Sequence, residues 1–265
     1  MTAAVCHCEE PDRATKQSDG LCQTMSLRAQ RSNRSLALNG SIALAERWYL
    51  KALRYSVAVP VHLVDHPLVH DALMSLRDKH TAPEQFRRAA TRISVLLAAE
   101  AMRDVPTTMT TVETPLGPTT GSRIGADVVV VPVLRAGLGM LDAVLDLMPH
   151  ARVGHIGLQR DEMTAVASQY YAKLPADLGG SYVVMIDPML ATGGSAVAAL
   201  DLLQHAGARA VRIVCIVAAP EGIRFVEQHH PEVHIYAPVV DLRLNEQKYI
   251  VPGLGDFGDR LYGTT

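Results

Sequence analysis

A short stretch in the C-terminal half of the chain combines residues that could hold a phosphorylated sugar. Residues 183–187 are four apolar residues followed by Asp187, and residues 192–195 read Thr-Gly-Gly-Ser. The apolar run suits a buried parallel strand, and the small residues suit a turn that opens a helix. Amides at a helix start can hold a phosphate, and a carboxylate at a strand end faces the ligand crevice. The stretch therefore predicts a phosphate cradle with a carboxylate at its mouth, suited to ribose hydroxyls or a magnesium ion.

Two other readings of this stretch are open from the residues alone. Gly-Gly before a helix is common in α/β proteins, and an Asp at a strand end often only caps the next turn. A Walker-type loop fits poorly, because no Gly-Lys-Ser/Thr follows the glycines. The motif does not predict a nucleoside triphosphatase.

Residues 187–195, Asp-Pro-Met-Leu-Ala-Thr-Gly-Gly-Ser, resemble the phosphoribosyl diphosphate (PRPP) loop of the uracil phosphoribosyltransferases. Related enzymes usually carry two adjacent acidic residues there, and Pro188 at the second place is typical of the uracil enzymes. The similarity extends from about residue 61 to residue 265, through further motifs at 134–140, 218–222 and 249–256. The resemblance implies an α/β fold with a type I phosphoribosyltransferase-like parallel sheet flanked by helices, and a small C-terminal base-binding hood.

The resemblance also implies which residues hold PRPP. Arg135 and Arg160 each follow a predicted strand, and a guanidinium offers a planar charged fork for the oxygens of the diphosphate. Magnesium is expected to act mainly through PRPP, with no direct protein ligand assigned. The full set of implied PRPP-binding residues is Arg135, Arg160, Asp187, Pro188, Met189, Leu190, Ala191, Thr192, Gly193, Gly194, Ser195 and Asp256.

The C-terminal segment 249–257 is expected to recognise the base. Backbone groups in a rigid Pro-Gly turn can match the alternating acceptors and donor of uracil, and the wrong base would leave polar groups unpaired. The resemblance implies contacts from Ile250, Gly255, Asp256 and Phe257. Phe257 stands where many bacterial relatives carry Ala, so the role of its side chain is open. Asp256 is the candidate general base, because no other acid lies in the segment.

The same segment contains a motif that resembles a dinucleotide-binding fingerprint. Residues 253–258 satisfy the Gly-x-Gly-x-x-Gly fingerprint of dinucleotide folds. Only seven residues follow Gly258, too few for the helix and acidic residue that the fingerprint requires. We expect no NAD or FAD site.

Composition limits the function classes further. The 265 residues are 48% hydrophobic with a net charge of -2, so a sizeable core is expected and a nucleic-acid surface is not. No apolar run approaches the ~18 residues of a membrane helix. Cys6, Cys8 and Cys22 lie in a polar N-terminus with a spacing that matches no familiar zinc site, and Cys215 reads as a core residue. A reducing cytoplasm is the simplest setting.

The chain divides into an N-terminal extension, 1–57, and a phosphoribosyltransferase domain, 58–265. We expect the extension to be disordered with one marginal helix, and its arginines resemble those of a transit peptide; a start-site artefact or a dispensable tail is the alternative. The sequence of this domain predicts a helix over 83–102, followed by alternating strands and helices. These are predicted at 128–134, 138–147, 152–158, 182–186, 195–206, 211–217, 221–229 and 233–237.

The expected reaction is transfer of the 5-phosphoribosyl group from PRPP to N1 of uracil, giving UMP and diphosphate in pyrimidine salvage. Asp187, Arg135, Arg160 and Asp256 are the expected catalytic residues. The alternatives are a non-catalytic nucleotide-sensing regulator on the same fold, and an enzyme of the same class acting on another base. Relatives are typically dimers or larger and some are activated by GTP, so a homo-oligomer and a GTP effector are also expected. The histidines pair with no nucleophile, and we expect most of them, including His230, at the surface.

Overall fold

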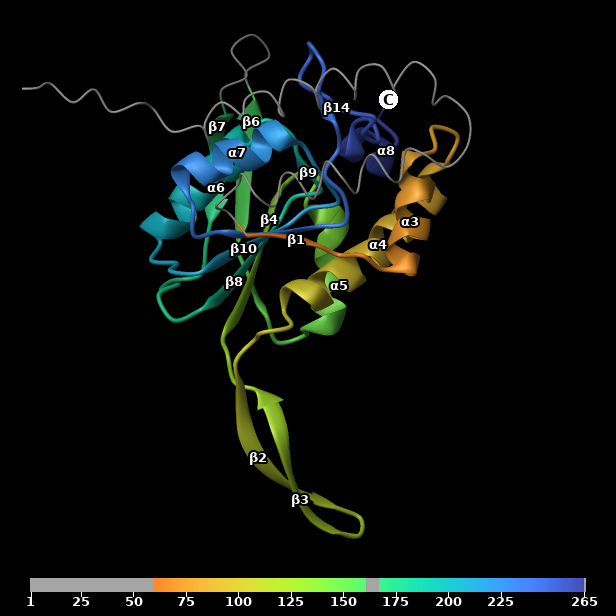
Figure 1. Cartoon of the computed structure of the whole chain (residues 1–265). Helices are drawn as coiled ribbons and strands as arrows, with labels where there is room; N and C mark the ends of the chain where they lie inside the picture. The colour runs from red at the N-terminus through yellow and green to blue at the C-terminus, as the bar shows by residue number, and fades with distance from the viewer. Residues whose placement is uncertain (1–59, 161–166, 265) are drawn as a thin grey trace, which may run out of the picture. The chain divides into compact units, whose positions relative to one another are not determined.

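The computed structural model describes residues 60–160 and 167–264, which form a domain around a mainly parallel sheet (Figure 1). The strand order is β1-β12-β10-β8-β4-β6-β7, and β5 pairs with β4. Strand β7 is antiparallel to β6, and the other described pairs of this sheet are parallel. Its strands are β1 (Val61–Leu63), β4 (Val128–Leu134), β5 (Arg152–Val153), β6 (His155–Arg160), β7 (Ala167–Lys173), β8 (Tyr182–Ile186), β10 (Val211–Val214) and β12 (His234–Ala237).

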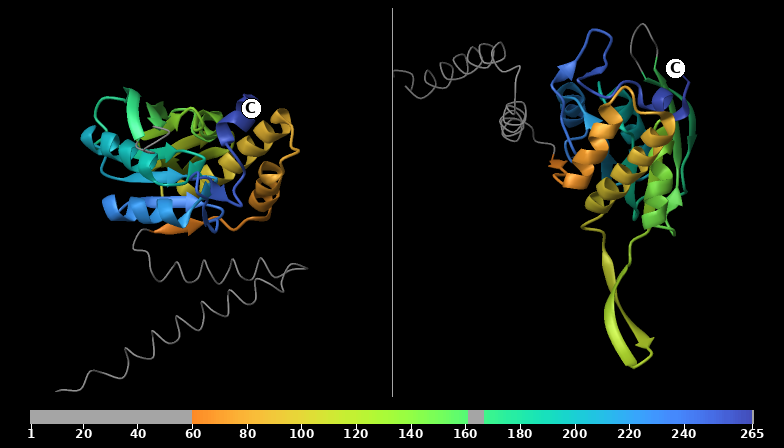
Figure 2. Two further views of the ribbon diagram at one scale, coloured as in Figure 1. Left: turned by 90° about the horizontal axis from the view of Figure 1, so that it is seen from above. Right: turned by 90° about the vertical axis from the view of Figure 1, so that its right-hand side faces the viewer.

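Helices cover both faces of the sheet (Figures 1 and 2). Helices α3 (Pro67–Arg77), α4 (Pro83–Ala101) and α5 (Leu138–Leu147) lie on one face, and α6 (Gly194–His205) and α7 (Pro220–His229) lie on the other. A short helix, α8 (Phe257–Tyr262), packs against α4 near the C-terminus. The predicted α/β fold with a parallel sheet flanked by helices is confirmed.

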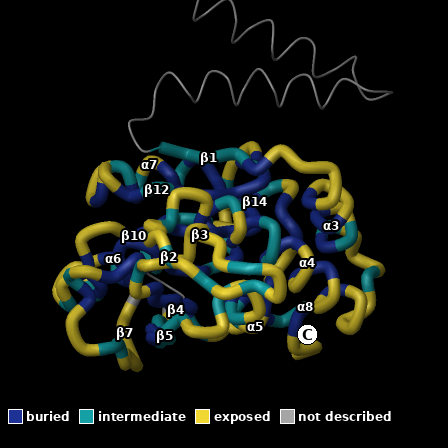
Figure 3. Tube along the Cα trace, turned by 90° about the horizontal axis from the view of Figure 1, so that it is seen from below, coloured by how far each residue is buried: buried dark blue, intermediate teal, exposed yellow. Residues whose placement is uncertain are grey.

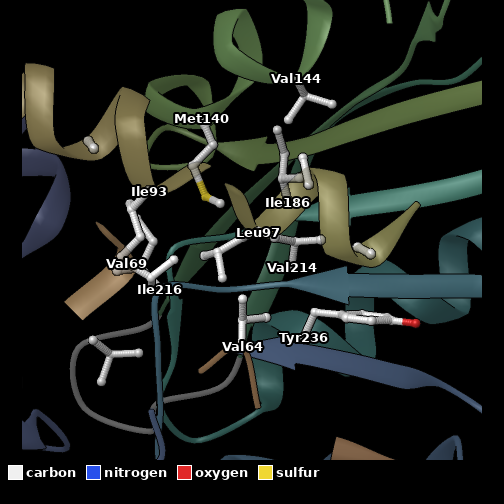
Figure 4. Packing of buried hydrophobic residues seen from close by; sticks show 14 of the residues in the cluster. Val64, Val69, Ile93, Leu97, Met140, Val144, Ile186, Val214, Ile216 and Tyr236 are labelled. Atoms are coloured by element: carbon white, nitrogen blue, oxygen red, sulfur yellow. The ribbon is translucent and has the colours of Figure 1, made fainter. Parts of the chain in front are cut away.

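The core lies between the sheet and α4. Every residue of β8 is buried, as are the first six residues of β4, which explains why both sequences are continuous apolar runs. Helix α4 buries one stripe, including Phe86, Ile93 and Leu97, against the sheet. Figure 4 shows Ile93 and Leu97 among side chains of the sheet, and Figure 3, coloured by burial along the Cα trace, shows buried residues in the interior and exposed residues along β2 (Thr107–Thr114), β3 (Gly117–Ile124) and the outer loops.

Several predicted elements have the expected bounds, and others are divided. The strands at 128–134 and 182–186 and the helix at 138–147 are confirmed. The helix predicted over 83–102 ends at Ala101. The strand predicted over 152–158 is split into β5 and β6 at Gly154, and the one predicted over 211–217 is split into β10 and β11 (Val217–Ala218). The predicted extension 1–57, the boundary after it, and Cys6, Cys8 and Cys22 lie outside the described residues.

An antiparallel hairpin that the sequence analysis did not predict extends away from the sheet (Figures 1 and 2). It consists of β2 (Thr107–Thr114) and β3 (Gly117–Ile124), paired from Thr107↔Ile124 to Thr114↔Gly117. Its residues are mostly exposed, and the turn carries a fully exposed Leu116. The two strands were missed because neither face of the hairpin is buried, so the sequence shows no apolar alternation.

One histidine expected at the surface is buried. His230, 3% exposed, lies between Asp201, whose carboxylate is 3.1 Å from Nε2, and Gln204, whose amide is 3.1 Å from Nδ1. It ends α7 where this helix packs on α6, and these polar partners compensate for its burial. Cys215 is buried, as predicted.

Two further absences hold for the described residues. None of the described helices has the length and apolar character needed to cross a membrane. Within residues 60–160 and 167–264, no group of three or more His, Cys, Asp and Glu side chains could hold a metal ion.

Phe86 should be a main contributor to stability, because its ring is fully buried on α4. We expect Phe86→Ala to lower the free energy of unfolding by about 3–5 kcal/mol in urea denaturation, through lost transfer energy and a residual cavity. Met74→Ala on α3, where the side chain is 66% exposed, is the control and should change it by less than about 0.5 kcal/mol. Equal losses in both variants would contradict this account of the core.

Candidate active site

The parallel sheet brings the two predicted donor-binding segments to one edge. Strands β4 and β8 are hydrogen-bonded neighbours, with Pro132 paired to Ile186. Since both strands run in the same direction, Arg135 after β4 and Asp187 after β8 emerge at the same end of the sheet. The chain also reverses its strand order here, because β6 and β8 flank β4 on opposite sides. Open α/β sheets bind their ligands at such a switch point.

The loop after β8 opens helix α6 as predicted. Gly193 is the residue before the helix and has φ = 83°, a left-handed conformation that favours glycine. A Cβ atom on Gly193 would lie 2.8 Å from the carbonyl oxygen of Gly222, so the position has no room for a side chain. The loop presents the amino end of a 12-residue helix, whose amides and dipole favour an anion.

A second segment, residues 217–222, packs against this loop and supports it. Residues Met189–Leu190 form β9, which pairs in parallel with Val217–Ala218 of β11. Beyond β11, a Cβ on Gly222 would lie only 2.5 Å from the carbonyl oxygen of Ala191. The 218–222 motif, which the sequence analysis recognised without a role, is therefore a backbone buttress of the phosphate loop.

Asp187 lies at the mouth of the loop with a strongly perturbed carboxyl group. Burial raises its pKa from 3.8 to about 7, and the hydrogen bond that the Met189 amide donates to Oδ1, at 3.4 Å, opposes this shift only partly. A carboxyl group that ionises near neutral pH gains most from a ligand that supplies hydrogen-bond donors or positive charge.

Arg135 is accessible to a ligand. Its side chain is 65% exposed, and Nη2 lies 3.7 Å from Oδ1 of Asp259. The Leu134–Arg135 peptide is cis, and the Gly137 amide donates to the Val133 carbonyl at 2.8 Å. A Cβ on Gly137 would lie 2.5 Å from the Ile186 carbonyl oxygen, so this loop packs directly on the end of β8.

Arg160 is the last residue of β6, and its backbone pairs with Ala167 of β7. Residues 161–166, which continue from it, lie outside the described residues. The assignment of Arg160 to the diphosphate stays a prediction.

The predicted base-binding residues and the donor loop line the same cavity, of about 920 Å³. Ile250, Gly255, Asp256 and Phe257 line it, as do Arg135 and Asp187. The other donor-loop residues that line it are Met189, Leu190, Ala191, Thr192, Gly193 and Ser195. The structure thus brings together three segments that are separate in the sequence.

Two predicted donor residues have other surroundings. Pro188 and Gly194 are absent from the described lining of the cavity. The carbonyl oxygen of Pro188 accepts hydrogen bonds from the amides of Ile216 and Val217, at 2.9 and 3.0 Å. Pro188 therefore anchors the loop to the segment that leads from β10 into β11.

The side chains of Asp256 and Phe257 are both engaged within the protein. Asp256 Oδ1 accepts a hydrogen bond of 2.9 Å from the Asp259 amide and caps helix α8. The Phe257 side chain, 1% exposed, packs on Phe86 with ring centroids 5.2 Å apart. The Phe257 ring therefore belongs to the core, and the contact of Phe257 with a base stays a prediction.

Several cavity residues were missed by the sequence analysis. They come from β6, from β7 and from the hairpin of β13 (Arg243–Leu244) and β14 (Ile250–Val251). They are Leu158, Gln159, Tyr170, Gln247, Lys248 and Tyr249. Tyr249 is the first residue of the recognised 249–256 motif, but it was given no role of its own, so the motif was the available signal for it.

Comparisons with known proteins agree with this geometry. A family model described as uracil phosphoribosyltransferase matches residues 63–264. A uracil phosphoribosyltransferase from Dictyoglomus thermophilum is 51% identical over 205 residues, which cover 77% of this chain and 99% of the relative. One from Halalkalibacterium halodurans is 49% identical over 205 residues, covering 77% and 98%. The solved AQ2163 protein from Aquifex aeolicus is 39% identical with a TM-score of 0.73, covering 77% of this chain and 99% of that one.

A parallel sheet with a phosphate-type loop and a facing hood at its carboxyl end defines the phosphoribosyltransferase class. Within that class, the chain belongs to the uracil phosphoribosyltransferase family.

The raised pKa of Asp187 predicts a pH-dependent cost to the ligand-free fold. The folded chain holds this proton more tightly than the unfolded chain, so the contribution of Asp187 to stability falls as pH rises from 3.8 to about 7. Asp187→Asn should therefore gain stability over the wild type between pH 4 and pH 8, by up to about 4 kcal/mol.

The measurement is chemical denaturation of the ligand-free protein across this pH range. Asp146→Asn, at an exposed position on α5, is the control and should follow the wild type. A constant difference between Asp187→Asn and the wild type at every pH would refute the assignment.

Proposed function

We propose that this protein transfers the 5-phosphoribosyl group from PRPP to N1 of uracil, giving UMP and diphosphate in pyrimidine salvage. The observation that carries the proposal is the single cavity shared by the donor loop, Arg135 and the 250–257 segment. Family membership supports the same reaction, and it gives no support to the regulatory alternative.

The proposed mechanism assigns each of these groups to one part of the reaction. Breaking the bond between C1 and the diphosphate leaves positive charge on the ribose and negative charge on the leaving group. Arg135, joined in our proposal by Arg160, stabilises that diphosphate with its guanidinium. The amides from Ala191 to Ser195 hold the 5-phosphate, and Asp187 accepts hydrogen bonds from the ribose hydroxyls.

Magnesium fits this arrangement through the substrate. Arg135 and Lys248 are the described cations that line this cavity, and the Asp187 carboxyl gains from a nearby positive charge. The ion would be held by the oxygens of PRPP, without a direct protein ligand, and would neutralise the diphosphate when bound.

The acceptor side works by backbone recognition. Ile250, Gly255 and Phe257 line the cavity together with the donor loop, and their amides and carbonyls would pair with the edge of uracil. Asp256 is our candidate to receive the N1 proton. Its carboxylate already accepts the Asp259 amide, so it would act with the free capacity of the second oxygen.

The proposal also includes an oligomeric state, an effector and a location in the cell. A homo-oligomer is favoured by the β2–β3 hairpin, which exposes Met109, Leu116 and Ile124. A GTP effector rests on the family resemblance alone. A cytoplasmic location rests on the cysteine content of the sequence.

The test is product formation by the purified protein with magnesium and PRPP, offering uracil, cytosine, orotate, hypoxanthine and adenine separately. We expect UMP from uracil alone. Asp187→Asn should lower kcat/KM roughly 10- to 100-fold, because a hydrogen bond to a charged group is weakened. PRPP binding without product from any base would sink the proposal in favour of the regulator, and product from another base would redirect it to that substrate.

The buttress yields a second prediction. Gly222→Ala places a methyl group against the Ala191 carbonyl and should displace the phosphate loop. We expect the KM for PRPP to rise about 10- to 100-fold, since small displacements of a binding group are costly. Gly180→Ala is the matched control, because a Cβ there meets no atom within 4 Å. An unchanged KM in Gly222→Ala would contradict the supporting role of the motif.

A further inference from the structure

The segment between Ile250 and Gly255, which we take to face the base, is a tight turn. Val251–Pro252 is a cis peptide, and Gly253 has φ = 59°. A Cβ on Gly253 would lie 2.2 Å from the Ile250 carbonyl oxygen. The cavity-lining residues Ile250 and Gly255 stand on either side of this turn, so any shift of the turn moves both of them.

A buried ion pair holds both backbone groups of Gly253. Arg77 Nη2 donates to Asp241 Oδ1 at 2.6 Å, and Nη1 donates to Oδ2 at 2.9 Å. Arg77 Nη1 also donates to the Gly253 carbonyl at 2.9 Å, while the Gly253 amide donates to Asp241 Oδ2 at 2.8 Å. The two side chains are only 17% and 1% exposed. Arg77 and Asp241, which make these four hydrogen bonds, form what we call the clamp.

A second arginine fixes the next residue of the turn. Arg260, on α8, donates from Nη1 to the carbonyls of Leu254, at 2.7 Å, and Leu76. Its Nη2 donates to the Asp78 carbonyl at 2.6 Å. The turn is thus tied to the carboxyl end of α3 through two carbonyl groups in succession.

We propose that Arg77 and Asp241 are positioning residues that determine the affinity for uracil while leaving PRPP binding to other contacts. Neither residue is among the described residues that line the cavity, so the clamp acts through the turn. The donor loop is held independently, by the β9–β11 pair and by Gly222. Backbone recognition tolerates little displacement, because each misaligned amide or carbonyl loses its partner on the base. The inference rests on the proposed function, since it takes the turn to be the uracil wall.

The experiment measures KM for uracil and for PRPP separately with the full chain. Arg77→Lys keeps the charge but cannot supply the two-pronged contact to the carboxylate and the carbonyl. We expect the KM for uracil to rise at least about tenfold and the KM for PRPP to stay within about twofold. Arg92→Lys is the matched control, because Arg92 pairs with Asp71 at an exposed position, and both constants should stay at wild-type values.

A double variant separates positioning from folding. Arg77→Met with Asp241→Leu removes both charges at nearly constant volume, a change that buried ion pairs often tolerate without loss of stability. We expect the variant to fold with a thermal midpoint below that of the wild type, because the amide and carbonyl of Gly253 lose these partners, and to show the same selective rise in the KM for uracil.

The outcomes distinguish this inference from the proposed function. If the wild-type chain makes no UMP, the proposed function fails and the clamp proposal fails with it. If the wild type is active but the KM for uracil is unchanged in both clamp variants, or the two KM values rise together, the clamp proposal alone is overturned.

Discussion

The active site depends on one close approach between two backbone segments, the Ala191 carbonyl and the start of α7 at Gly222. The space between them is too small for a methyl group, as the 2.5 Å separation from an added Cβ indicates. This contact, with the β9–β11 pair, fixes the loop that opens α6 before any ligand arrives. An anion site that is held in place in this way needs little reorganisation when a ligand binds, so little binding energy is lost to it. The Asp187 carboxyl beside it has the opposite character, since desolvation raises its pKa and so disfavours its charged form.

The fold was predictable where burial alone determines the pattern. Strands β4 and β8 are buried throughout or nearly so, and their bounds could be identified from continuous apolar runs. The β2–β3 hairpin has no buried face and left no such pattern. Gly154 also divides a predicted strand, and a Cβ there would lie 2.7 Å from Leu174, a contact between segments that no local pattern reveals.

The separate motifs of the candidate site could be predicted from the sequence, but the contacts between distant residues that hold these motifs in place could not. Asp187, Arg135 and Ile250 were identified locally, and the sheet brings them to one cavity. The Arg77–Asp241 pair could not be identified, because its members are 164 residues apart and neither lies in a recognised motif. The Phe257 ring was similarly ambiguous: its burial depends on Phe86, which lies on a helix far away in the sequence.

The clamp also bears on the order in which the domain can be completed. Contacts between distant residues form late in folding, because a long loop must close first. Arg77 lies on α3 near the start of the described domain, whereas Asp241, Gly253 and Arg260 lie near its end. The phosphate loop and its support from β11 and Gly222 come from residues that precede the hood in the sequence. The wall that would select a base, in contrast, requires the C-terminal segment to close back onto α3.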